Sequence, residues 1–238
     1  MSKPRVIACA DRQTVARRAR ELVSAQIVAT VSRRHVFHLA LAGGSTPQPL
    51  YERLAADPWC VPWPAVRFYF GDERCVSPDD PESNYRMARE TLLDRLPIAG
   101  EQIERMRAED RDRERAAADY VRKLPLKLDL VLLGLGTDGH TASLFPDSPA
   151  VRDQQRRVVV TTGPKPPHER LTITPPVLRD ADELLVLVTG AEKANVLKQV
   201  LLGDWNPHVL PAQLARRGTW IIDREAAGEL PSGGFEED

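Results

Sequence analysis

Short apolar runs along the chain alternate with longer segments in which apolar residues recur every three or four positions. In residues 12–32, Val15, Ala19, Leu22 and Val23 follow that spacing, which is typical of a helix with one buried face. The apolar runs predict strands over residues 5–10, 35–44, 66–73, 128–136, 156–163, 183–190 and 218–223. The periodic segments predict helices over residues 12–32, 47–56, 84–96, 109–123 and 192–202. This alternation indicates an α/β fold with a Rossmann-like, mainly parallel sheet covered by helices on both faces.

Length and composition favour one domain. The chain has 238 residues, of which 42% are hydrophobic, and this is enough for one sizeable core or at most two small ones. No internal repeat and no linker rich in Gly or Ser divides it. We therefore expect a single domain over residues 1–230, followed by a flexible tail over residues 231–238.

Charge and cysteine content narrow the classes of function. A formal net charge of −1 and a pI near 6.5 give no basic footprint for nucleic acid or for an anionic membrane. No apolar run approaches the roughly 20 residues of a membrane helix, and the apolar stretch near the N-terminus is too short for a signal peptide. Cys9, Cys60 and Cys75 lack the spacing of a disulfide framework or a zinc site. We expect a cytoplasmic globular protein without a metal.

Polar and glycine-rich segments follow several predicted strands. In a parallel sheet, ligands bind where the carboxyl ends of the strands meet, so these segments are the candidate site. They are AGGSTP (42–47), GDERCVSPDDPESNY (71–85), GLGTDGH (134–140), TTGPKPPHERLTIT (161–174) and TGAEKA (189–194).

The fourth predicted strand ends in Gly134-x-Gly136-x-x-Gly139, which is the spacing of a dinucleotide-binding loop. Such a site needs an acidic residue at the tip of the next strand, but that strand ends in VVVTTG. Asp138 inside the loop would also repel a pyrophosphate. The context argues against NAD and leaves Asp138 and His140 as candidates for acid–base chemistry. The alternative is a polar cluster that caps a helix.

Two other segments carry candidate anion-binding groups. Gly43 and Gly44, followed by Ser45 and Thr46 at a helix start, could bind a phosphate, or the hydroxyls could simply cap the helix. The segment lacks the lysine of a nucleoside-triphosphate loop. Lys193 in the first turn of a helix opposes the helix dipole, which suggests a nearby anion.

The segments GDER and KPPHER are open to two interpretations. Asp72 and Arg74 would point to the same side of a strand, but a surface salt-bridge turn is an equal alternative. Arg170 lies in KPPHER, which in isolation is most simply a solvated loop. His35 and His38 flank a strand and are interpreted as structural. Beside Arg74, the thiol of Cys75 has no partner fixed by the sequence.

Read together, these segments resemble the 6-phosphogluconolactonase family. The resemblance covers almost the whole chain, and its matching segments are LAGGSTP, FYFGDERCVSPDDPESNYRMA, LDLVLLGLGTDGHTASLFP, GPKPPHERLTIT, LLVLVTGAEKANVL and PAQLARRGTWIIDREAA. It implies a Rossmann-like fold shared with glucosamine-6-phosphate deaminases, a place in the oxidative pentose phosphate pathway, and neither a metal nor an organic cofactor. The deaminases carry a Glu five residues after the histidine of the Asp-Gly-His loop. Phe145 at that position favours a lactonase.

The resemblance and the residues together predict how a phosphorylated sugar lactone would be hydrolysed. His140 takes a proton from water and returns it to the leaving oxygen, and either Asp138 or Asp72 orients the imidazole. Arg74 stabilises the oxyanion or holds sugar hydroxyls. The phosphate is held by the 43–46 loop together with Arg170 and Lys193. A deaminase-like isomerase and a silent sugar-phosphate binder remain alternatives, and the sequence leaves monomer and homodimer open.

Overall fold

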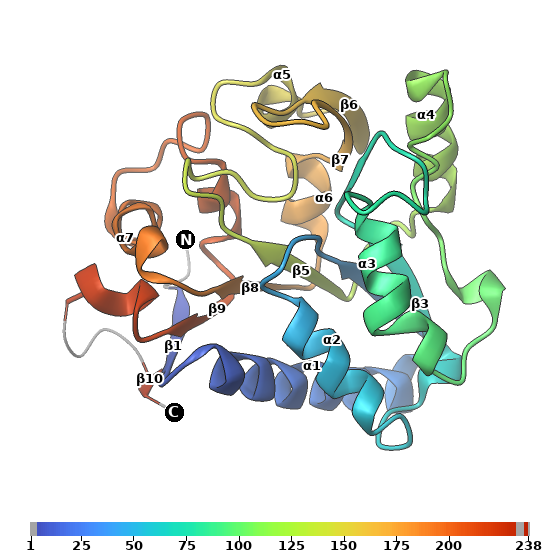
Figure 1. Ribbon diagram of the computed structural model, residues 1–238, viewed down its shortest axis with the longest axis horizontal. Helices are drawn as coiled ribbons and strands as arrows, with labels where there is room; N and C mark the ends of the chain where they lie inside the picture. Colours follow the sequence, from blue (N-terminus) through green and yellow to red (C-terminus); the bar gives the residue numbers. More distant parts are fainter. Residues whose placement is uncertain (1–3, 232–235, 238) are drawn as a thin grey trace.

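The computed structural model describes residues 4–231 and 236–237, which form an α/β fold around one central sheet (Figure 1). The sheet has seven strands, all parallel, in the order β10-β1-β9-β8-β5-β2-β3. Their bounds are β1 Arg5–Cys9, β2 Phe37–Leu41, β3 Val66–Phe70, β5 Leu130–Gly134, β8 Glu183–Val188, β9 Thr219–Asp223 and β10 Glu236–Glu237. The predicted mainly parallel sheet is confirmed.

Helices cover both faces of this sheet. One face carries α1 Arg12–Arg34, α2 Gln48–Ala56 and α3 Asn84–Thr91, and the other carries α4 Arg113–Lys123, α6 Pro175–Asp180 and α7 Ala194–Leu202. Alternate residues of β5 separate the two cores: Leu130 and Leu132 pack with α1 and α2, while Val131 and Leu133 pack with α4 and α7. The remaining helices are short: α5 Pro149–Arg152 and the 3₁₀ turns Trp63–Ala65, Leu93–Arg95, Gly100–Gln102, Ala191–Lys193, Pro211–Ala215 and Ala226–Glu229.

A second, antiparallel sheet corrects the predicted strand list. It consists of β4 Asp72–Arg74, β7 Glu169–Ile173 and β6 Val158–Thr162, in the order β4-β7-β6. The predicted strand over 66–73 is therefore two strands. At Gly71 the chain changes sheets, because its N–H bonds to Leu41 of β2 while its carbonyl accepts from Ile173 of β7. The strand predicted over 156–163 lies outside the parallel sheet.

Strand β7 was missed in the sequence, where residues 161–174 were interpreted as a loop at a strand end. The prolines and charged residues before it hide the apolar alternation, and its partners β4 and β6 are known only from the tertiary structure.

Two features interpreted as structural behave as such. His35 closes α1 in the left-handed region, with φ of 64°. His38 is half-buried in β2, and its Nδ1 lies 3.2 Å from the hydroxyl of Tyr69. Both histidines therefore serve the fold.

Most of the predicted tail lies outside the described residues, namely 232–235 and 238. Within the tail, Glu236–Glu237 forms β10 beside β1, and Glu236 pairs with Arg5 at 3.0 Å. No helix in the described part of the chain is long and apolar enough to cross a membrane.

The strand order fixes where a ligand can bind. The chain proceeds from β2 to β3 toward one edge of the sheet, and from β5 through β8 to β9 toward the other edge. The direction of the connections therefore switches between the neighbouring strands β2 and β5. In open α/β sheets, ligands bind at the carboxyl ends of the strands beside such a switch.

Candidate active site

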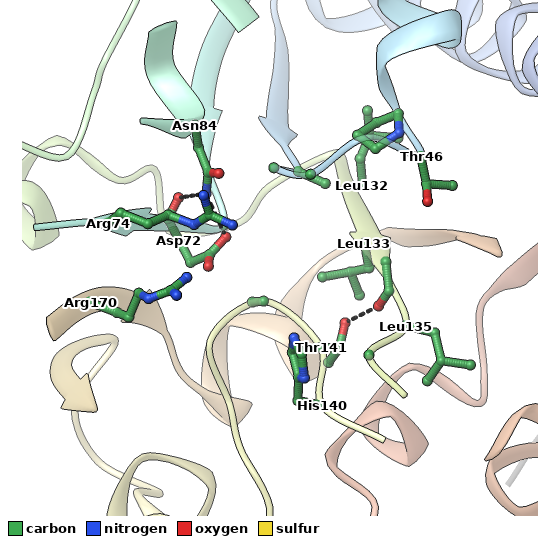
Figure 2. A pocket seen from close by; sticks show the side chains of 18 of the residues that line it. Thr46, Asp72, Arg74, Asn84, Leu132, Leu133, Leu135, His140, Thr141 and Arg170 are labelled. Atoms are coloured by element: carbon green, nitrogen blue, oxygen red, sulfur yellow. Dashed lines mark hydrogen bonds between the residues drawn. The ribbon is translucent and has the colours of Figure 1, made fainter. Parts of the chain in front are cut away.

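A pocket of about 230 Å³ lies at this switch point (Figure 2). The strand order determines the spatial order of the loops around the pocket: Lys193 follows β8, His140 follows β5, Gly43–Thr46 follow β2, and Asp72 begins β4 after β3. Residues from all five predicted strand-end segments line the pocket: Gly43, Gly44, Thr46, Asp72, Arg74, His140, Arg170 and Lys193. The structure thus brings most of the candidate residues together.

The glycines after β5 serve the conformation of the His140 loop. A Cβ atom on Gly136 would lie 2.0 Å from Nδ1 of His140, so only glycine leaves room for the imidazole. Gly139 has φ of +85°, and a Cβ there would meet Leu210 at 2.6 Å. Backbone hydrogen bonds from Gly136 to His140 and from Gly139 to Gly136 close the turn. The dinucleotide-like spacing therefore reflects a tight histidine-bearing loop.

His140 and Asp138 form a hydrogen-bonded pair within this loop. Nδ1 of His140 lies 2.5 Å from Oδ1 of Asp138, and the backbone N–H of His140 also donates to this oxygen at 3.2 Å. Burial raises the pKa of the Asp138 carboxyl, but the hydrogen bond and charge of His140 outweigh it, so that pKa is lowered overall. Asp138 is thus a carboxylate, which can only accept a hydrogen bond. Nδ1 therefore carries the proton, and in the neutral ring Nε2 keeps its lone pair.

Asp72 belongs to a different, buried network that the sequence reasoning missed. Its Oδ2 accepts a 2.5 Å hydrogen bond from Oγ of Ser143, and its Oδ1 accepts one from Nδ2 of Asn84 at 3.1 Å. All three side chains are buried. A Cβ on Gly43 would lie 1.9 Å from Oδ1 of Asn84, so this network also presses against the 43–46 loop. The sequence offered one indication that Ser143 belongs to the site, namely its position three residues after His140.

Glu73 points away from the pocket, as the alternation along β4 predicts. Its carboxylate accepts hydrogen bonds from the backbone N–H groups of Asn84 and Tyr85 and from Oγ of Ser83, at 2.7–3.1 Å. Burial raises the pKa of Glu73, while the backbone hydrogen bonds partly offset this effect. Glu73 thereby fastens the start of α3 to β4 and places Asn84 beside Asp72.

Arg74 and Arg170 lie directly opposite each other on β4 and β7, and Figure 2 shows both beside Asp72. Arg170 is buried, and its guanidinium donates to the carbonyls of Pro167 and Lys165. Burial lowers the pKa of Arg170, and the neighbouring charge of Arg74 lowers it further. This end of the pocket thus carries two guanidinium groups beside the buried carboxylate of Asp72, and the exposed carboxylate of Glu82 lies 3.6 Å from Arg74.

The loop after β2 lies across the pocket from Arg170, with Thr46 on the opposite side in Figure 2. Gly44 has φ of +85°, and Pro47 caps α2 without a side-chain hydrogen bond. Ser45 is exposed and does not line the pocket, and its carbonyl accepts a hydrogen bond from Arg12. Of the residues that the sequence assigned to the phosphate, Ser45 therefore lies outside the pocket, while Gly43, Gly44, Thr46, Arg170 and Lys193 line it.

Lys193 lines the pocket in the turn before α7. Burial lowers the pKa of this lysine, whereas the charges of Glu192 and Asp138 raise it, and Lys165 lowers it further. Among the strands that border the pocket, Lys193 follows β8 at one end, and Arg170 lies on β7 beside β4, which follows β3 at the other end. The pocket therefore has two cationic ends with His140 in the row between them.

The remaining candidate residues, Cys75 and His168, offer little reactivity. Burial raises the pKa of the Cys75 thiol to about 11, which argues against an activated nucleophile. Nδ1 of His168 lies 2.9 Å from the carbonyl of Gly163 in the β6–β7 turn. Among residues 4–231 and 236–237, no three His, Cys, Asp or Glu side chains are grouped as a metal site requires.

Residues 10–222 match the family described as glucosamine-6-phosphate isomerases/6-phosphogluconolactonase. The chain therefore belongs to this family. A glucosamine-6-phosphate deaminase structure matches with a TM-score of 0.83 at 22% identity over 94% of this chain and 99% of that chain, a likeness of fold.

Several relatives within the family are 6-phosphogluconolactonases. The protein of that name from Synechocystis is 37% identical over 95% of this chain and 98% of its own length. The Mycobacterium tuberculosis protein is 37% identical over 92% and 94%, respectively. The structure of 6-phosphogluconolactonase from Trypanosoma brucei matches with a TM-score of 0.85 at 31% identity, covering 97% of this chain and all of that one.

Proposed function

We propose that this protein hydrolyses 6-phospho-D-glucono-1,5-lactone to 6-phospho-D-gluconate in the oxidative pentose phosphate pathway. The observation that carries the proposal is the match to lactonases over nearly the whole of both chains. The Asp138–His140 pair in a pocket with cationic ends supports it, because the substrate has a phosphate at one end and an ester carbonyl at the other.

His140 is the general base. Nε2 takes a proton from water as the water oxygen attacks C1 of the lactone, and the carbonyl oxygen becomes an oxyanion. The bond between C1 and the ring oxygen then breaks, and the imidazolium returns the proton to that oxygen. Asp138 orients the ring and stabilises its charged form, since it already accepts from Nδ1.

Asp72, Arg74 and Arg170 bind the lactone end of the substrate, away from the phosphate. The guanidinium groups stabilise the oxyanion, and Asp72 accepts hydrogen bonds from sugar hydroxyls. The charges of Asp72 and Glu82 oppose those of the two guanidinium groups, so this end suits the oxyanion of the reaction better than a phosphate dianion.

The phosphate is held by Gly43, Gly44 and Thr46 together with Lys193, whereas Ser45, which the sequence also assigned to it, lies outside the pocket. Glycine backbone N–H groups at the start of α2 and one lysine are well suited to a dianion. Arg170, which the sequence assigned to the phosphate, joins Arg74 in this proposal because the two face each other across β4 and β7.

The deciding experiment compares lactone loss with and without the protein, because the lactone also hydrolyses unaided. We expect a large acceleration over the spontaneous rate. A silent sugar-phosphate binder would bind 6-phosphogluconate and leave the rate unchanged. A deaminase-like isomerase would release ammonia from glucosamine 6-phosphate. The cytoplasmic location and the choice between monomer and homodimer remain predictions.

A further inference from the structure

We infer that Phe145 is a positioning residue for His140, acting as one wall of the slot that holds the imidazole. The inference rests on the proposed role of His140. The two ring centroids are 4.7 Å apart, with the planes tilted by 48°. Phe145 is buried, with 7% of its surface exposed, whereas the side chain of His140 keeps 31% exposed toward the pocket.

The phenyl ring is itself held from behind. A Cβ on Gly163 would lie 3.0 Å from Cζ of Phe145 and 3.1 Å from Cε2, so the ring packs directly on the backbone of the β6–β7 turn. Gly163 donates to the carbonyl of His168 at 2.7 Å, which fixes that backbone. Phe145 therefore packs the histidine loop against the antiparallel sheet, in addition to the hydrogen bonds that Ser143 makes to Asp72 and Thr172.

Three contacts together define the orientation of the imidazole. Asp138 holds Nδ1, Gly136 closes around Nδ1 and Cε1, and Phe145 packs against the ring. A single hydrogen bond to Asp138 would leave the ring free to pivot about that bond. The packed ring removes this freedom and keeps Nε2 directed at the attacking water, where a displacement of about 1 Å can cost about 10²-fold in rate.

Phe145 also separates two spaces. His140 lines the reaction pocket, while Phe145 and Asp138 line a neighbouring open cleft of about 780 Å³. Without the phenyl ring, water from this cleft would reach the imidazole on the side away from the substrate. The Asp138–His140 hydrogen bond would then be weaker, because hydrogen bonds strengthen as the local dielectric falls.

The first test is the rate of Phe145→Ala against Leu144→Ala. Leu144 is the preceding residue, is fully buried and gives a matched loss of apolar packing in the same loop. We expect kcat of Phe145→Ala to fall roughly 10- to 100-fold, with KM and the Kd for 6-phosphogluconate within about threefold of wild type. Leu144→Ala should keep kcat within about threefold. An equal loss of kcat in both variants would assign the effect to loop packing and overturn the inference.

The second test measures access to the imidazole itself. Diethyl pyrocarbonate modifies neutral histidines, and peptide mass spectrometry reports each site separately, so exposed His35 is an internal control. In Phe145→Ala, the modification rate at His140 should rise at least about threefold, with His35 unchanged. Unchanged modification of His140 would overturn the inference.

Phe145→Leu keeps most of the apolar volume but removes the flat ring. This variant tests the inference if Phe145→Ala does not fold. The inference predicts that kcat of Phe145→Leu falls by at least about threefold at unchanged KM. A wild-type kcat in this variant overturns it. If the wild-type protein itself fails to accelerate lactone hydrolysis, the proposed function fails instead, so the two failures are distinct.

Discussion

Nδ1 of His140 lies 2.5 Å from the carboxylate of Asp138, two residues earlier in the same loop, while Asp72 is bonded to Ser143 and Asn84 instead. The sequence left open which carboxylate orients the imidazole. In the structure, Asp138 is the one that contacts it. The two carboxylates therefore have separate roles in the proposed mechanism.

His140→Ala should fold normally and lose about 10²- to 10⁴-fold in kcat, which is the range for a general acid–base residue. The measurement is initial lactone hydrolysis corrected for the spontaneous rate, with folding followed by circular dichroism. A variant that keeps the wild-type rate would remove His140 from the mechanism.

Asp138→Asn and Asp72→Asn should separate kcat from KM. An amide at position 138 cannot hold the imidazole in the same tautomer with the same charge, so kcat should fall by about 10²-fold or more at little-changed KM. Asp72→Asn should raise KM, because its proposed partners are sugar hydroxyls. If both variants behaved alike, the two carboxylates would not have the separate roles proposed here.

Gly136→Ala should lower activity although residue 136 carries no proposed catalytic group itself. The added Cβ would lie 2.0 Å from Nδ1 of His140 and 2.7 Å from Oδ1 of Asp138, so the pair must separate. Gly100→Ala is a control away from the pocket, since a Cβ there meets nothing within 4 Å. We expect a loss of roughly 10-fold or more in kcat for the first variant alone. Equal rates for the two variants would contradict the tight slot.

Lys193→Ala should raise KM for the phosphorylated lactone roughly 10- to 150-fold, because a charge-assisted hydrogen bond contributes about 1.5–3 kcal/mol. The control substrate is δ-gluconolactone, which lacks the phosphate. Lys193→Ala should change its hydrolysis little, while Arg170→Ala should impair both substrates. A loss restricted to the phosphorylated substrate in Arg170→Ala would place Arg170 back at the phosphate.

The affinity for 6-phosphogluconate should depend on pH through Lys193. Burial lowers the pKa of this lysine below its ordinary value, so it loses its charge at a lower pH than a surface lysine does. The cation is present below that pKa and lost above it, so binding should weaken as pH rises through the lowered pKa. Titration calorimetry of wild type and Lys193→Arg tests this, because arginine stays charged. An identical alkaline loss in both proteins would show that another group titrates.

The alternation of apolar runs and helical segments determined the fold class, and the strand-end loops predicted one edge of the sheet where Gly43, Asp72, His140 and Lys193 indeed line a pocket. Both could be read from the sequence because a strand followed by a helix, and the loop between them, are local features. The alternation along β4 likewise determined that Asp72 and Arg74 face the pocket and Glu73 does not.

Only the tertiary structure decided which distant groups meet. The pairing of β4 with β7 placed Arg170 beside Arg74, and the strand order put Lys193 at the other end of the pocket. Asn84 and Ser143 reach Asp72 from 12 and 71 residues away, and Phe145 rests on Gly163 of another sheet. Such contacts depend on strand order, on antiparallel register and on the space around glycines. These are set by how the whole chain packs, so no local pattern of residue types encodes them.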